Sequence, residues 1–164
     1  MATYQLDARR VGVDVTVQDA TIKYEIGERA TGTDGSKWQY VIGTEDLTQG
    51  MCVAIGNNGV ALKVTSALAI AQNSFGFVQA AVTIASTAYY WVCTDSGGGN
   101  YKIAALSAAV ASTPLNTSGT AGILDDAYTT FVPILGVRLV SSNAATAVLT
   151  AVWSNLTSFR VSGV

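Results

Sequence analysis

Short apolar runs rich in β-branched and aromatic residues recur along the chain about every ten residues, separated by turn residues. One pair is MCVAI (51–55) and VALKV (60–64), joined by Gly-Asn-Asn-Gly at 56–59. Asn and Gly accept the positive φ of a tight reversal, so this pair predicts a β-hairpin. Long amphipathic stretches with a helical period are absent. The pattern therefore restricts the chain to an all-β fold, a barrel or a sandwich.

Two further hairpins are predicted: residues 88–94 with 101–106 through DSGGGN, and residues 131–140 with 145–153. Gly76 suggests a bulge or bend, and Pro133 an edge or a bulge. Only the Ala-rich pieces at 66–72 and 106–111 suit short helical turns. We therefore expect a compact β-barrel, β-tulip or sandwich body of short antiparallel strands, with an extended N-terminal arm and one or two short helical turns.

Charge is distributed unevenly along the 164 residues. Residues 1–46 hold 13 of the 20 charged side chains, although charged residues make up only 12% of the chain. This shift predicts a polar arm and linker over 1–46 and an apolar body over 47–164. Low charge with 49% hydrophobic residues favours an oligomer or an assembly component over a free monomer. A net charge of −2 gives no reason to expect nucleic acid binding, and no apolar run is long enough to span a membrane.

The sequence Asp95-Ser96-Gly97-Gly98 also surrounds the nucleophile of trypsin-like serine proteases. That nucleophile needs a histidine base, and the chain contains no histidine. A Ser-Lys dyad with Lys63 or Lys102 stays open in principle, but it requires a Lys pKa lowered by an apolar pocket. We interpret the stretch as the tip of a hairpin, exposed to solvent or to a neighbour's rim. No catalytic residue is therefore assigned, and the protein is predicted not to be an enzyme.

Other candidates for chemistry also have structural explanations. Glu45-Asp46 and Asp125-Asp126 suit turns, with an incidental surface cation as the alternative. Cys52 and Cys93 are expected to be buried within strands, because two cysteines cannot supply a four-ligand zinc site. The three glycines at 97–99 do not form a phosphate-binding loop, since they lead into a strand without a following Lys-Ser/Thr. No metal and no cofactor are predicted.

Two aromatic clusters follow the period of a strand. Trp38 and Tyr40 share one face, as do Tyr89 and Trp91. Packed or interfacial aromatics are the first interpretation. The alternative is a carbohydrate-binding surface on which Trp38, Tyr40 and Trp91 stack against sugar rings.

The stretch from Lys37 to Trp153 resembles a group of small β-rich virion proteins of tailed phages, known as head decoration or cement proteins. The resemblance rests on Gly76-Phe77-Val78-Gln79, on Tyr89-Tyr90-Trp91-Val92, and on the run from Pro114 to Asp126. These motifs are structural, and the first 36 residues match no part of that group. The resemblance implies binding to the outer surface of the capsid shell, where the protein bridges neighbouring subunits. It also implies a homotrimer or another symmetric oligomer.

The partners expected are therefore the major capsid protein and further copies of this chain, with neither nucleic acid nor membrane. Assembly in the host cytoplasm and a place on the virion surface follow from the same resemblance. A head–tail connector, a tail protein and a carbohydrate-binding module remain alternatives. Arg9-Arg10 suggest an arm that binds a partner, although a solvated terminus explains them as well. The candidate contacts with shell or neighbour are Tyr4, Arg9, Arg10, Val13, Val15, Val17, Trp38 and Tyr40.

Overall fold

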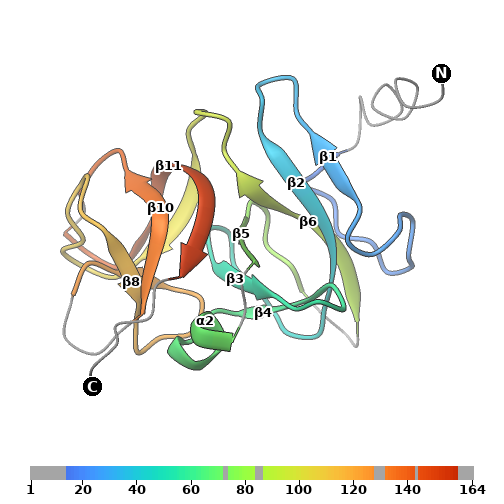
Figure 1. The fold of residues 1–164 in the computed structure, drawn as a ribbon, viewed down its shortest axis with the longest axis horizontal. Helices are drawn as coiled ribbons and strands as arrows, with labels where there is room; N and C mark the ends of the chain where they lie inside the picture. Colours follow the sequence, from blue (N-terminus) through green and yellow to red (C-terminus); the bar gives the residue numbers. More distant parts are fainter. Residues whose placement is uncertain (1–13, 72–73, 84–86, 128–131, 143, 159–164) are drawn as a thin grey trace.

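The fold consists of two β lobes placed side by side along the long axis of the molecule (Figure 1). It is known from a computed structural model, which describes residues 14–71, 74–83, 87–127, 132–142 and 144–158. Within those ranges the regular structure is almost entirely strand, with one short helix. The predicted all-β class is thereby confirmed.

The first lobe is a single sheet in the order β1-β2-β4-β3-β5-β6. Strand β2 also pairs with β6, so the ladder returns to β2 and closes on itself. β1 and β4 occupy different ends of the other edge of β2. The strands are β1 (Arg29–Thr31), β2 (Lys37–Gly43), β3 (Cys52–Ile55), β4 (Val60–Lys63), β5 (Ser74–Val78) and β6 (Ala88–Asp95).

The second lobe is a closed barrel in the order β10-β11-β7-β9-β8. A β-bulge interrupts the β10–β11 ladder between Leu135 and Val137, where Gly136 adopts a φ of 91°. The sequence predicts an edge or a bulge at Pro133, but Pro133 pairs with Asn116 and the bulge lies three residues further on. The strands are β7 (Tyr101–Ala105), β8 (Leu115–Thr117), β9 (Leu124–Asp125), β10 (Pro133–Leu139) and β11 (Ala147–Ser158).

A short helix, α2 (Ser66–Ala71), connects β4 to β5. It confirms the first of the two predicted helical turns. The second, at 106–111, is a non-helical turn. Gly76 does not bulge, because the β3–β5 register is regular there. A Cβ at Gly76 would instead lie 3.1 Å from the Val92 side chain, so glycine allows the neighbouring strand to approach.

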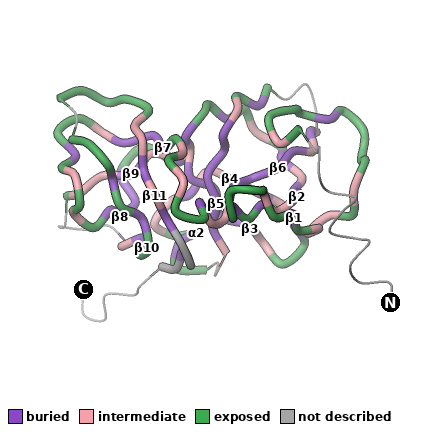
Figure 2. Tube along the Cα trace, turned by 90° about the horizontal axis from the view of Figure 1, so that it is seen from above, coloured by how far each residue is buried: buried purple, intermediate pink, exposed green. Residues whose placement is uncertain are grey.

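Two hydrophobic clusters form the interior (Figure 2). The smaller lies inside the closed ladder of the first lobe and includes Val41, Val53 and Val92. The larger lies on the opposite face of β2 and β6 and continues through the second barrel, from Tyr40 to Trp153. One apolar core is therefore shared by both lobes.

Two of the three predicted hairpins are confirmed, β3–β4 and β10–β11. The hairpin across DSGGGN is wrong. β6 pairs with β2 and β5, and β7 pairs with β11 and β9, so the two strands lie in different lobes. Both edges of β6 are already taken, one by β2 and the other by the preceding strand β5, so β7 cannot pair with β6 and the chain crosses over. Two strand pairs, β2–β4 and β7–β9, are parallel, unlike the predicted antiparallel arrangement.

The polar arm expected up to residue 46 does not extend that far, because β1 and β2 belong to the sheet. Upstream of them, Asp19 forms a β-bridge with Tyr89 of β6, so the chain lies on the body from there. Charged side chains in this region alternate with buried ones, as at Lys37 and Trp38. Charge density alone therefore did not mark a boundary. Residues 1–13 lie outside the described chain.

Candidate functional site

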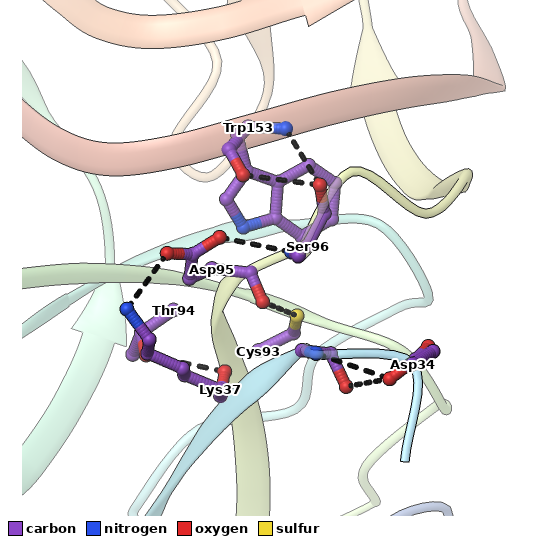
Figure 3. Close-up of polar contacts among 9 residues, drawn as sticks. Asp34, Lys37, Cys93, Thr94, Asp95, Ser96 and Trp153 are labelled. Atoms are coloured by element: carbon purple, nitrogen blue, oxygen red, sulfur yellow. Dashed lines mark hydrogen bonds and ion pairs between the residues drawn. The ribbon is translucent and has the colours of Figure 1, made fainter. Parts of the chain in front are cut away.

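Ser96, the position of the protease-like nucleophile, is fully buried where the two lobes meet (Figure 3). Its Oγ donates a hydrogen bond to the Trp153 carbonyl and accepts one from the Trp153 amide, each at 3.0 Å. The Ser96 amide donates to the same carbonyl at 2.9 Å. The end of β6 is thereby fastened to β11, 57 residues further along the chain. The predicted exposed hairpin tip is wrong at this residue.

The residues on either side shape the loop around Ser96. The Asp95 Oδ1 accepts a hydrogen bond from the Gly97 amide at 2.9 Å, while Oδ2 lies 3.2 Å from the Lys37 ammonium (Figure 3). Gly97 and Gly98 follow with φ of 59° and 87°, values that L-residues rarely adopt. Asp95 thus stabilises the turn through Oδ1 and forms an ion pair with Lys37 of β2 through Oδ2.

The tip of the β1–β2 hairpin packs against this loop. A Cβ on Gly97 would lie 2.4 Å from the Gly35 carbonyl carbon, so only glycine fits there. Beside Gly35, Asp34 accepts hydrogen bonds from Ser36 and from the Tyr101 hydroxyl of β7. These bonds lower the pKa of Asp34 to about 2. The hairpin tip therefore contacts both the crossover loop and the second lobe.

Gln79 makes a second connection between the lobes, which sequence reasoning missed. Its side-chain amide donates to the Lys102 carbonyl and accepts from the Lys102 amide, both at 2.9 Å. The Gln79 side chain thus forms the two hydrogen bonds with Lys102 that a neighbouring strand would otherwise form with β7. Nearby, the Ala104 amide donates to the Gly50 carbonyl at 2.7 Å. The only signal in the sequence was the Gln at the end of Gly-Phe-Val-Gln, which closes β5 with a polar residue.

Aromatic rings fill the space between these polar connections. Phe77 of β5 and Trp153 of β11 have ring centroids 4.6 Å apart, and Tyr101 lies 5.8 Å from Trp153. On the first-lobe side, Trp38 lies edge-on to Tyr101 at 5.7 Å. We define the lobe junction as Gln79, Ser96, Gly97, Tyr101 and Trp153.

This environment explains Ser96 without catalysis. Within the described chain, its hydroxyl bonds only to the backbone of Trp153. The two candidate bases point elsewhere: Lys102 Nζ donates to Thr150 and Lys63 Nζ lies 3.8 Å from Glu45. Burial raises the pKa of the Cys93 thiol in the same strand, so the neutral thiol is favoured. The arrangement fastens strands together, and neither of the two candidate lysines bonds to the serine hydroxyl.

The carboxylate pairs also serve local structure. Glu45 accepts a hydrogen bond from the Lys63 amide. The Asp126 carboxylate accepts one from the Val110 amide at 3.0 Å, and Asp125 Oδ1 accepts one from the Asp126 amide. No group of three or more potential metal-ligating side chains occurs among the described residues. Cys52 and Cys93 are both buried and unbridged.

The aromatic members of the predicted interface lie in the core. Trp38 is 4% exposed and Tyr40 is fully buried, so neither is available to a shell or a neighbour, and the assignment of both is wrong. With Trp91 also buried, these rings cannot stack on sugars, which removes the proposed carbohydrate platform. Trp38 and Tyr40 do share one face of β2, as predicted. That face is covered by Tyr24, whose ring lies 5.1 Å from Tyr40, and by Tyr101, which lies 5.7 Å from Trp38.

The remaining predicted contacts precede β1. Val15 is half-buried against the shared core, whereas Val17 is exposed. Tyr4, Arg9, Arg10 and Val13 lie outside the described residues. The segment is fixed by Asp19, whose buried carboxylate accepts from the Tyr40 hydroxyl at 3.0 Å and pairs with Lys23.

No protein-family model matches the chain, and no curated protein matches it significantly in sequence. In the described part of the chain, none of the helical structure is long and apolar enough to cross a membrane.

Proposed function

We propose that this protein is a capsid decoration protein of a tailed phage, which binds the outer surface of the shell and bridges neighbouring major capsid subunits. The observation that carries the proposal is a contrast. The residues that suggested a catalytic or binding site in the sequence are used for packing. Apolar side chains such as Val17, Ile22, Val140 and Val148, in contrast, remain exposed. Exposed apolar surface on a weakly charged β body suits a protein that functions in an assembly.

The sequence resemblance supports the same role. Two of its motifs occupy structural positions, Gln79 at the lobe junction and Tyr89–Val92 in the centre of β6. A bridging protein needs a rigid body and two contact surfaces, and it needs no active site.

The direct test is binding to expanded empty capsids of a tailed phage, measured by co-sedimentation and by the capsid's resistance to heat. We expect saturable binding at many sites per particle and a higher temperature of capsid disruption. A matched variant lacking residues 1–13 tests whether the segment before the described body contributes. Saturation at a single ring of copies would favour a head–tail or tail component, and absence of binding to any shell would contradict the proposal.

A further inference from the structure

One patch on the outer face of the second barrel, formed by β10, β11 and β7, is apolar and positively charged. Strand alternation places Arg138 of β10, Val148 and Thr150 of β11, and Lys102 of β7 on the outside, and exposed Val140 follows directly after β10. The register sets Thr150 opposite Lys102, and the Val140 amide donates to the Thr150 carbonyl at 3.0 Å. Val140 is 52% and Val148 43% exposed. We call these five residues the barrel face.

Both charges on the barrel face are positive and exposed, and none of its five residues is acidic. Among the residues that the structure describes, the Lys102 ammonium bonds to the Thr150 hydroxyl alone, at 3.3 Å. The strands of the barrel close into a ring, which favours contact through its outer face over addition of a strand. A partner that docks on the barrel face should offer an apolar centre with carboxylates around it.

The segment before β1 has that complementary character. Residues 14–28 carry four acids and one lysine, and exposed Val17 (44%) and Ile22 (56%) lie among them. Asp14 and Glu25 are exposed, whereas Asp19 is buried and paired with Lys23. We call residues 14–28 the acidic segment.

The acidic segment is held firmly enough to serve as a docking surface. The Gln18 side chain bonds to both backbone groups of Thr83, at 2.6 and 2.9 Å, and Asp19 is fixed by Tyr40. The segment belongs to the end of the molecule that carries β1, and the barrel occupies the other end (Figure 1).

We propose that the barrel face of one copy docks on the acidic segment of a second copy, head to tail. Two barrel faces brought together would oppose like charges, which disfavours a symmetric pair through this face. A heterologous contact repeated around an axis closes into a ring when the rotation allows it. The inference supplies the contact for the symmetric oligomer that the sequence resemblance implies, and to that extent it rests on the proposed function. Its test uses no capsid, so the two can fail separately.

The test measures mass against protein concentration by native mass spectrometry and light scattering. Wild type should form a discrete oligomer, and the double reversals Lys102→Glu/Arg138→Glu and Asp14→Lys/Glu25→Lys should each weaken association at least about tenfold. A chain carrying all four reversals has complementary surfaces again and should recover the wild-type mass. Arg29→Glu, an exposed reversal on β1 outside both surfaces, should leave the mass unchanged.

Circular dichroism checks that each variant is folded. If a reversal unfolds the protein, Val17→Ser and Val140→Ser replace it and should also weaken association. A wild type that stays monomeric at every concentration would overturn the proposal. So would double reversals that keep the wild-type mass, or a four-reversal chain that stays dissociated while folded.

Discussion

The turn between β3 and β4 and the loop between β6 and β7 are built from similar residues but connect different neighbours. Gly56 to Gly59 joins two strands that pair with each other, Val53 opposite Lys63. Asp95 to Gly99 leads from β6 of the first lobe to β7 of the second, and these two strands do not pair with each other. Its buried serine bonds to β11 instead. Similar turn residues thus mark a change of direction, and the free edges of the adjoining strands decide where the chain goes next.

The largest effect is expected at Gly97, where the crossover loop meets the β1–β2 hairpin. Gly97→Ala forces a positive φ on alanine and places its Cβ against the Gly35 backbone, so we expect a loss of about 4 kcal/mol in unfolding free energy. Gly98→Ala has the same strain but open space around the Cβ, and should cost about 1–2 kcal/mol. Urea unfolding measures both. Equal losses would show that the loop does not pack as described.

The next largest loss of stability is expected at Gln79. Gln79→Ala removes two hydrogen bonds and leaves the Lys102 amide and carbonyl without the side chain that binds them, which should cost about 3 kcal/mol of unfolding free energy. Gln18 makes the same two-bond contact with Thr83 on the exposed surface, where water can replace it. Gln18→Ala should therefore cost less than about 1 kcal/mol. If thermal unfolding finds the two variants equally stable, the junction does not depend on Gln79.

Ser96→Ala should destabilise by about 2 kcal/mol, because the Trp153 amide loses its acceptor in a fully buried site. Its partly exposed neighbour gives the control: Thr94→Ala loses a bond to the Lys37 carbonyl and should cost about 0.5 kcal/mol. Hydrogen exchange should show faster exchange at the Trp153 amide in Ser96→Ala only. An unchanged Trp153 amide would contradict the fastening role.

The smallest effect concerns pH. Hydrogen bonds from Ser36 and Tyr101 lower the pKa of Asp34 from 3.8 to about 2, so the folded state favours the ionised form. This stabilisation is present above about pH 4 and is lost as pH falls toward 2. Asp34→Asn should unfold with a flatter pH dependence than wild type across that window. A parallel dependence in both proteins would remove Asp34 from the account.

Local features of the fold could be predicted from the sequence. The β3–β4 hairpin, helix α2 and the shared face of Trp38 and Tyr40 depend on neighbours within a few residues. The crossover at Ser96 could not be predicted, because it depends on β2 taking the edge of β6 and on Trp153, 57 residues away. For the same reason the sequence left open whether Trp38 and Tyr40 are packed inside the protein or lie at an interface, and their assignment to the interface was wrong. A strand pattern shows that one face is apolar, and it does not show what covers that face.

The central claim is that the two lobes form one cooperative unit, joined by the shared core and the lobe junction. Hydrogen exchange of peptides from each lobe, followed through urea unfolding, tests it directly. Peptides from β2 and β6 and peptides from β7 and β11 should lose protection at the same urea concentration. A second lobe that loses protection at clearly lower urea while the first stays protected would contradict the account.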